Sequence, residues 1–197
     1  LMVGFNRQSM SNKYRGMTIA EAAELRGESP EEAIVNLIIE DGSRIQCIYF
    51  SMSEENVRKK IMLPWVSFDS DAGSYSDISK DFITHPRAFG SFARVLGKYV
   101  RDEKLITMEE AIRRLTGFPA DNLGIENRGY LKPGYFADVV VFDPELIEDK
   151  ATFEKPLQFA VGVEDVFVNG VQVLSGSEHT GEYPGRFVKG AGYSPSY

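Results

Sequence analysis

The chain changes its sequence pattern at about residue 127, and neither of the two resulting parts holds enough strands to close a sheet. In the first part, marked helix starts alternate with two short apolar segments, residues 44–50 and 64–68, which we predict to be strands of a parallel α/β layer. In the second part, β-prone segments follow one another without a helical period. A two-stranded parallel sheet exposes both of its edges. The sequence therefore predicts that the chain borrows partner strands or is the C-terminal piece of a longer protein.

Five helices are predicted in the first part. Three begin at capping boxes, in which a hydroxyl and a glutamate three residues later satisfy free amide groups; these lie at residues 18–21, 29–32 and 107–110. Two more are expected from about residue 53 to 62 and from about residue 88 to 101. These helices would cover the predicted strands.

The second part is predicted to form a separate β element. Residues 137–142 (ADVVVF) form an apolar segment typical of a strand, and Asn169-Gly170 between two Val-rich segments is a strong hairpin signal. Residues 181–197 are rich in Gly, Pro and Tyr and predict an extended tail. We therefore expect the chain to be organised differently on the two sides of about residue 127, with a tail over residues 181–197.

The charge and cysteine content exclude several classes of protein. The 22 Lys and Arg against 29 Asp and Glu give a net charge of -7, which disfavours nucleic acid and anionic membranes as partners. No apolar run approaches the roughly 20 residues of a membrane helix. The single cysteine, Cys47, excludes an internal disulfide and suits a reducing compartment, so a cytoplasmic location is expected.

Three basic residues at helical spacing, Arg94, Lys98 and Arg101, predict a solvated helix face.

Histidine is scarce, with only His85 and His179 in the whole chain. A catalytic zinc usually takes three protein ligands among which histidine is prominent. The chain by itself is therefore not expected to hold a complete metal site.

Candidate chemical groups follow the second predicted strand. Asp69 and Asp71 come directly after residues 64–68, and carboxylates at the carboxyl end of such a strand suit general acid/base work or metal ligation. Arg87 could hold an anionic substrate, and His85 could carry a proton or orient a neighbour. Spacing alone favours ordinary loop residues and a surface ion pair, so both interpretations stay open.

Several motifs stand in a fixed order: SDA at 70–72, HPRAFGSFARVLG at 85–97, the helix at 107–117, NRGYLKPGYFADVVVFD at 127–143 and VNGV at 168–171. In this order the chain, from about residue 12 to 188, resembles the C-terminal portion of the N-acyl-D-amino-acid deacylases (D-aminoacylases) of the metal-dependent amidohydrolase superfamily. The segment 128–143 is shared across that superfamily, whereas the His-Pro-Arg segment is more specific to the deacylases.

The resemblance implies an α/β fold: the last two strand-helix units of a (β/α)8 barrel, plus strands of a small β-sandwich. Residues 44–50 would be the seventh barrel strand and residues 64–68 the eighth. The N-terminal part of the same protein would supply the other strands. In this family a zinc ion polarises the amide carbonyl and lowers the pKa of its bound water, and its ligands lie on earlier strands. The resemblance thus implies zinc as the cofactor, with no metal ligand in this chain.

The resemblance also assigns roles to three residues. Asp71 matches the general base that activates water and then protonates the leaving amine. Asp69 stands where the family usually has a small residue and is the less favoured candidate. Arg87 matches the binder of the substrate carboxylate, and we assign His85 beside it to substrate binding.

The function expected of the longer protein is hydrolysis of the amide bond of a small N-acyl-D-amino acid. A cyclic-amide hydrolase of the dihydroorotase or hydantoinase kind is the alternative within the superfamily, and the His-Pro-Arg segment counts against it. A non-catalytic fragment or interaction module is the alternative from another class, and the scarcity of histidine favours it. The chain alone is expected to be inactive.

Overall fold

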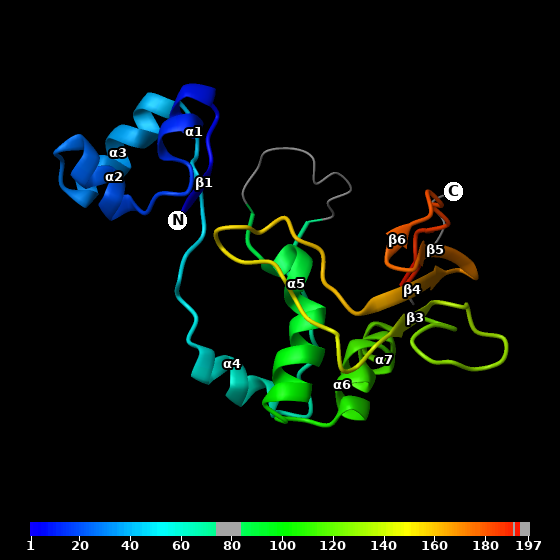
Figure 1. The fold of residues 1–197 in the computed structure, drawn as a ribbon. Coiled ribbons are helices and arrows are strands. Elements are labelled where there is room, and N and C mark those ends of the chain that lie inside the picture. Colours follow the sequence, from blue (N-terminus) through cyan, green and yellow to red (C-terminus); the bar gives the residue numbers. More distant parts are fainter. Residues whose placement is uncertain (74–83, 191, 194–197) are drawn as a thin grey trace. The chain divides into compact units, whose positions relative to one another are not determined.

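The structure, a computed structural model, describes residues 1–73, 84–190 and 192–193 (Figure 1). The chain separates into two compact units. The first comprises Leu1–Met52, Ala72–Ala88 and Ala151–Gln158, and the second comprises Ser53–Asp71, Phe89–Lys150 and Phe159–Tyr197. Each unit has its own hydrophobic core.

The first unit consists of short helices and one small pair of strands. Its elements are β1 (Met2–Gly4), α1 (Gln8–Tyr14), α2 (Ile19–Arg26), α3 (Pro30–Asp41) and β2 (Gln46–Cys47). β1 pairs with β2 in antiparallel orientation. The core gathers Met2, Tyr14, Ala22 and Leu37, with Cys47 packed against them.

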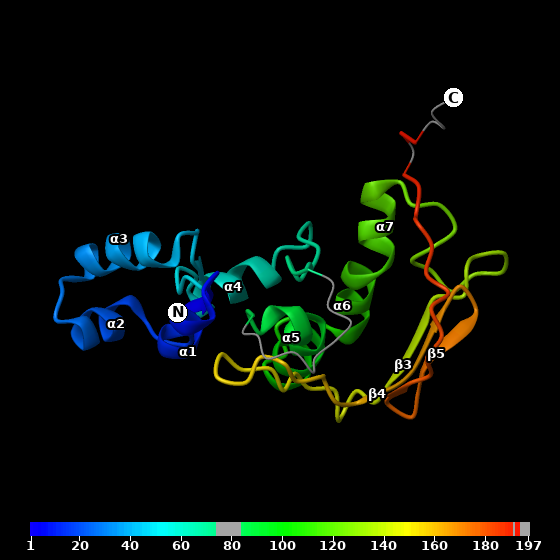
Figure 2. The ribbon, with the colours of Figure 1, turned by 90° about the horizontal axis from the view of Figure 1, so that it is seen from above.

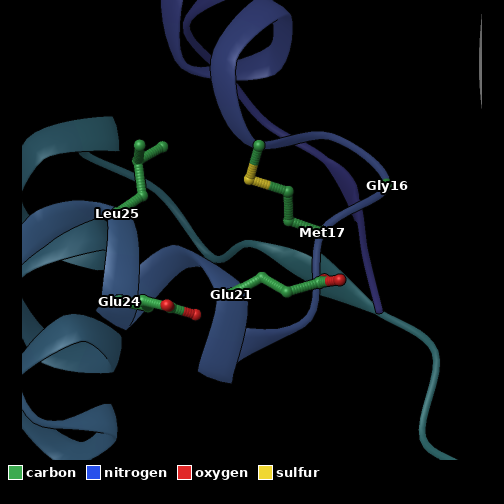
Figure 3. A pocket seen from close by; sticks show the side chains of 5 residues that line it. All are labelled: Gly16, Met17, Glu21, Glu24 and Leu25. Atoms are coloured by element: carbon green, nitrogen blue, oxygen red, sulfur yellow. The ribbon is translucent and has the colours of Figure 1, made fainter.

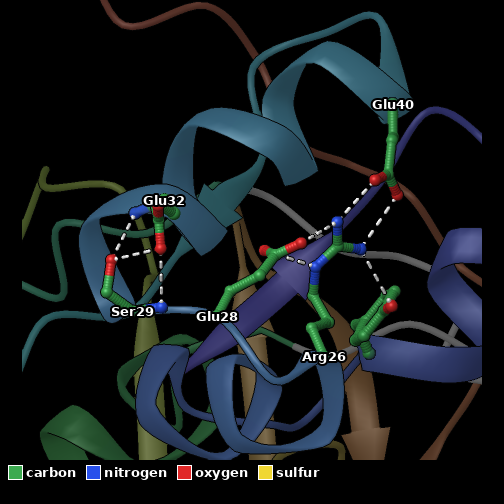
Figure 4. Close-up of polar contacts among 6 residues, drawn as sticks. Arg26, Glu28, Ser29, Glu32 and Glu40 are labelled. Carbon is green, nitrogen blue, oxygen red and sulfur yellow. Dashed lines mark hydrogen bonds and ion pairs between the residues drawn. The ribbon is translucent and has the colours of Figure 1, made fainter.

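Local chemistry explains where the helices of this unit begin. Thr18 and Ser29 form complete capping boxes with Glu21 and Glu32, as predicted. Figure 4 shows the second box beside the Arg26 side chain. The pKa of Glu32 is lowered by the hydrogen bonds it accepts from the Ser29 backbone and side chain. The boxes thus fix the start of α2 and of α3.

Arg26 links α2 to its neighbours. Its Nε lies 2.8 Å from Glu28 Oε2, and its Nη2 lies 2.5 Å from Glu40 Oε1 (Figure 4). Its Nη1 donates to the hydroxyl of Tyr14 at 3.1 Å. Hydrogen bonds from Arg26 lower the pKa values of Glu28 and Glu40, so both carboxylates are ionised in the folded unit at neutral pH.

The second unit contains helices followed by a sheet. α4 (Glu54–Ile61), α5 (Arg87–Arg94, which begins in the first unit), η1 (Val95–Asp102, a π-helix), α6 (Met108–Leu115) and α7 (Gly117–Leu123) precede β3 (Val139–Phe142), β4 (Val163–Val168), β5 (Val171–Ser175) and β6 (Glu178–His179). The strands form one antiparallel sheet in the order β3-β4-β5-β6. Figure 2 shows β3, β4 and β5 side by side.

The core of this unit lies between the α5–η1 helix, α6 and the chain before the sheet. Its buried members are Ala93, Val95, Leu96, Val100, Ala111 and Ile147. Ser53 and Thr107 accept hydrogen bonds at the starts of α4 and α6, as predicted, although the Glu110 side chain bonds to Arg113 and leaves the third capping box half formed. The predicted helix over residues 88–101 is present as α5 continued by η1.

The basic residues of this helix are partly exposed to solvent and also bond to other segments. Arg94 pairs with Asp149 at 2.7 Å, and Lys98 pairs with Glu54 at 2.5 Å. Arg101 donates to the carbonyl oxygen of Ile147 at 2.8 Å. Each of them therefore ties the helix to another segment of the second unit.

The hairpin of the second part is confirmed. Asn169 and Gly170 both have positive φ, 50° and 82°, between β4 and β5, as a tight hairpin of this kind requires. β3 lies within the predicted segment 137–142. The described residues of the predicted tail, 181–190 and 192–193, contain no helix or strand.

Neither of the two segments predicted as strands in the first part forms a strand of a parallel sheet among the described residues. Of residues 44–50 only Gln46 and Cys47 form a strand, and they pair antiparallel with β1. Residues 64–68 form no strand, and Trp65 is 69% exposed. A strand exists only beside a partner that accepts its hydrogen bonds. Among the described residues none lies beside this segment, and the Val66 carbonyl accepts a side-chain hydrogen bond from Arg114 instead.

Candidate functional site

Asp71 lies at the end of the irregular segment that follows α4, and its side chain is exposed. Its φ is 45°, in the left-handed region that few residues other than glycine adopt. Aspartate tolerates this conformation better than most side chains because its short polar group can bond locally. The backbone therefore turns sharply at the predicted base.

Asp69 lies two residues earlier and has a local role. Its Oδ1 accepts the backbone N–H of Ser70 at 2.7 Å, and the residue is exposed. A carboxylate that accepts the next amide is typical of a turn. The contact gives Asp69 a local structural role in the turn. Asp71 stays the favoured candidate for the general base.

His85 and Arg87 lie together at the start of α5. The backbone N–H of Arg87 donates to His85 Nδ1 at 3.1 Å, and the backbone N–H of Ala88 donates to the carbonyl oxygen of His85. Since Nδ1 is an acceptor, a neutral imidazole at this position carries its proton on Nε2. The imidazole thus caps the start of the helix and presents an N–H on its other side.

The surroundings of His85 favour the neutral imidazole. Its ring packs edge-on against Phe153, with the centroids 5.1 Å apart, and Phe153 in turn packs against Phe50 at 4.8 Å. Burial, together with the positive charge of Arg87, lowers the pKa of His85 from its ordinary value. At neutral pH the site is therefore a neutral N–H donor beside an exposed guanidinium.

The sequence did not reveal Phe153 as the neighbour of His85. The residue belongs to an irregular segment, Ala151–Gln158, that has no periodic pattern to place it. Asp71 belongs to the second unit and His85 to the first, so each of them is described within its own unit.

The other candidates do not gather into a metal site. Within residues 1–73, 84–190 and 192–193, no three His, Cys, Asp or Glu side chains stand close enough to share an ion. Cys47 packs against the first core, and burial raises the pKa of its thiol. His179 is exposed, and its Nδ1 accepts the backbone N–H of Gly181 at 2.9 Å. These positions agree with a core cysteine and a surface histidine.

The first unit also has an open pocket. Its lining residues are distant in the sequence from the candidate site residues. Figure 3 shows its lining side chains beside Gly16, namely Met17, Glu21, Glu24 and Leu25. Glu21 is already committed to the capping box with Thr18. None of the predicted site residues lines this pocket.

Comparison with known proteins gives the family. Residues 8–174 match the model of the amidohydrolase family. The chain belongs to the amidohydrolase family. This amidohydrolase chain is 38% identical over 173 residues to a D-aminoacylase of Alcaligenes xylosoxydans xylosoxydans, covering 88% of the chain and 34% of the relative. It is 39% identical over 142 residues to an N-acyl-D-glutamate deacylase of the same organism, covering 72% and 28%.

Solved structures give the same result for the fold. A crystal structure of D-aminoacylase matches with a TM-score of 0.78 at 33% identity, covering 92% of this chain and 36% of that one. An N-acyl-D-glutamate deacylase from Bordetella bronchiseptica, complexed with zinc and a phosphonate inhibitor, matches with a TM-score of 0.74 at 36% identity, covering 87% and 34%. This mixed α/β amidohydrolase chain therefore resembles the D-aminoacylase fold and spans about a third of the length of these relatives.

Metals occur in these structural neighbours. The deacylase complex contains zinc, and another D-aminoacylase structure addresses a binuclear metal centre.

In the part of this amidohydrolase chain that the structure describes, no helix is long and apolar enough to cross a membrane.

Proposed function

We propose that the amidohydrolase chain is the C-terminal portion of a zinc-dependent enzyme that hydrolyses the amide bond of N-acyl-D-amino acids. The observation that carries the proposal is the similarity to D-aminoacylase, in sequence over 88% of the chain and in structure over 92%. A cytoplasmic location belongs to the same proposal and rests on the acidic composition and the single cysteine.

Asp71 is proposed as the general base. Its carboxylate takes a proton from the attacking water and returns it to the nitrogen of the leaving amine. The exposure of Asp71 and its left-handed backbone support this role, because conformations of this kind concentrate at functional sites.

Arg87 and His85 are proposed to bind the free carboxylate of the substrate. The guanidinium of Arg87 can hold two carboxylate oxygens in parallel hydrogen bonds, and the neutral imidazole of His85 can offer its Nε2 hydrogen. Their common position at the start of α5 adds the positive end of the helix dipole. The guanidinium, the imidazole N–H and the positive end of the helix dipole would all stabilise an anionic group of the substrate.

The described residues do not fit a complete zinc site, because they contain no cluster of three metal-binding side chains. The proposal therefore assigns the metal ligands to the part of the enzyme outside this chain. No step assigned to Asp71, His85 or Arg87 depends on the position of the metal. This chain by itself is expected to have no activity.

The surface of the chain supports a missing partner segment of the same protein. Tyr49 is 80% exposed, and Phe50, Met52 and Trp65 are also largely exposed around the segments predicted as barrel strands. Within the first unit, the neighbouring exposed side chains of Tyr49, Phe50 and Met52 are typical of a surface that another part of a protein covers, and Trp65 is an exposed apolar side chain of the second unit. We propose that residues 1–125 complete a (β/α)8 barrel with that part, that residues 126–180 add strands to a β-sandwich, and that residues 181–197 form the tail.

Hydrolysis of a cyclic amide is the second candidate. It is favoured by relatives called dihydroorotase, such as one of Lactobacillus gasseri that is 42% identical over 55 residues. That match covers only 28% of this chain, whereas the D-aminoacylase match covers 88%. The longer match favours a linear amide.

Replacement of Asp71 in the full-length enzyme tests the proposed chemistry. Asp71→Asn keeps the shape of the side chain but removes the base, and we expect kcat to fall about 10²- to 10⁴-fold. Asp69→Asn is the matched control, because it makes the same change two residues away in the same loop, and it should keep kcat. Equal rates for Asp71→Asn and the wild type would disprove the role of Asp71.

Replacement of Arg87 tests the carboxylate site. Arg87→Met should raise KM for an N-acyl-D-amino acid by about 10- to 100-fold, since hydrogen bonds to a charged group contribute about 1.5–3 kcal/mol. The carboxamide of the same substrate serves as the control, because it lacks the anion and its KM should not respond to the substitution. An equal effect on both substrates would contradict carboxylate binding by Arg87.

A further inference from the structure

Arg114 on α6 is the most completely buried charged side chain of the second unit, with no exposed surface. Its Nη1 donates to the carbonyl oxygen of Ile61 at 2.6 Å, and its Nε donates to the carbonyl oxygen of Val66 at 2.5 Å. Its guanidinium carbon lies 4.5 Å from the centroid of the Phe68 ring. One side chain thus contacts residues 61–68 at three points.

The contacts of Arg114 hold residues 61–68 in place where the backbone hydrogen bonds of a sheet are absent. Residues 64–68 form no strand and have no ladder of backbone hydrogen bonds. Ile61 is the last residue of α4, so its carbonyl lies at the negative end of that helix and attracts a cation. The planar guanidinium fixes the directions of its hydrogen bonds, which a flexible ammonium group does not. Phe68 in turn packs against the second core.

Stability alone does not explain an arginine here. No carboxylate is hydrogen-bonded to Arg114 in the described residues, and its Nη2 has no hydrogen-bond partner among them. Burial lowers the pKa of the Arg114 guanidinium even though the Glu110 carboxylate attracts it without a hydrogen bond. Apolar side chains that replace buried charges often leave a protein as stable or more stable. The arginine is better explained by what it holds in place.

We infer that Arg114 is a positioning residue for Asp71. By fixing the end of α4, the Val66 carbonyl and the Phe68 ring, it sets the direction in which the chain leaves toward Asp71, three residues after Phe68. The left-handed turn at Asp71 then presents the carboxylate. This inference rests on the proposed role of Asp71 as the base.

A double-mutant cycle in the full-length enzyme tests the inference. The variants are Arg114→Met, Arg114→Lys, Asp71→Asn and the combination of Arg114→Met with Asp71→Asn, assayed on an N-acyl-D-amino acid. Since misplacement of a catalytic group by about 1 Å can cost about 100-fold, Arg114→Met should lower kcat by about 10- to 100-fold and leave KM nearly unchanged. Arg114→Lys should restore part of the loss, because an ammonium can reach one carbonyl but cannot reproduce the planar contact. In the Asp71→Asn background, Arg114→Met should have little further effect.

Arg101 offers the matched control. It is also an arginine of the second unit that donates to two carbonyl oxygens, those of Glu145 and Ile147, but it holds a loop that does not lead to Asp71. Arg101→Met should lower Tm and keep kcat, measured at a temperature at which every variant is folded. If Arg114→Met does not fold, the kcat of Arg114→Lys is compared with that of Arg101→Met instead.

The outcomes separate the inference from the proposed function. Unchanged kcat in both Arg114 variants, equal loss in Arg101→Met, or a full multiplication of the effects in the double variant would overturn the positioning role. Wild-type activity in Asp71→Asn would instead overturn the proposed base. Loss in Asp71→Asn with full activity in the Arg114 variants would refute the inference alone.

Discussion

Asp41 is a buried carboxylate whose replacement should loosen the first unit. It is the last residue of α3 and has no exposed surface. Its two oxygens accept the backbone N–H groups of Asn6 and Arg7, both at 2.9 Å, and the hydroxyl of Ser43 at 2.5 Å. The carboxylate therefore joins the end of α3 to the chain that enters α1.

The size of the effect follows from these three bonds. A hydrogen bond to a charged group contributes about 1.5–3 kcal/mol, but Asn6 and Arg7 are exposed residues whose amides can regain water. We therefore expect Asp41→Ala to lower the free energy of opening the first unit by about 3 kcal/mol. Asp41→Asn keeps one acceptor oxygen and should lower it by about 1.5 kcal/mol.

The effect should depend on pH. Burial raises the pKa of Asp41, but the hydrogen bonds from Ser43, Arg7 and Asn6 outweigh it and leave the pKa below its ordinary value. A depressed folded-state pKa stabilises the protein above the unfolded-state pKa of about 4, and this stabilisation is lost as the pH falls through the folded-state value. The difference between the wild type and Asp41→Asn should therefore shrink in acid.

Hydrogen exchange followed by mass spectrometry measures the effect locally. Peptides that cover α1 and the end of α3 should exchange faster in Asp41→Asn than in the wild type at pH 7. Glu31→Gln, in the exposed first turn of the same helix, is the control and should change the free energy of opening by less than about 0.5 kcal/mol. Wild-type exchange in Asp41→Asn would refute the reasoning.

Two further predictions concern close packing and reactivity. A Cβ on Gly97 would lie 2.5 Å from the carbonyl oxygen of Ile147, so Gly97→Ala should destabilise the second unit by about 1–3 kcal/mol in a urea titration. Gly185→Ala, where none of the described residues has an atom within 4 Å of the new Cβ, should be neutral, and equal midpoints for the two variants would count against the packing argument. Burial raises the pKa of Cys47, so iodoacetamide should modify it more slowly at pH 7 than in urea. Equal rates in both conditions would show that the thiol is accessible.

The helices and the hairpin could be predicted because their signals are local. A capping box needs only a hydroxyl and a glutamate three residues apart, and Thr18 and Ser29 form it as the sequence requires. Asn169-Gly170 likewise carries its own backbone preference into the turn. Helix starts and tight turns of this kind depend on a few neighbouring residues, so the sequence alone can predict them.

The strands of the first part could not be predicted in the same way, because a strand depends on its neighbours. Residues 64–68 have an apolar, β-prone composition but no adjacent strand in the described structure, so Arg114 takes the place of a ladder. Arg114 is fully buried although it is charged, and nothing in the sequence analysis singled it out. Long-range contacts of this kind leave no local signal.

The residues of the candidate site remain predictions from the sequence, whereas their contacts come from the structure. The motif around residue 85 pointed to His85 and Arg87, and the structure adds the hydrogen bond between them that fixes the imidazole tautomer. The ring of Phe153, which packs edge-on against His85, lies more than 60 residues away in the sequence. A contact of this range depends on the tertiary fold.

The central claim is that the enzyme containing this chain hydrolyses the linear amide of N-acyl-D-amino acids. The direct test compares initial rates of the purified full-length protein, loaded with zinc, on an N-acetyl-D-amino acid, its L enantiomer and a hydantoin. The account predicts release of the free D-amino acid with the highest kcat/KM of the three. Preferred hydrolysis of the hydantoin, or equal rates on the two enantiomers, would contradict it.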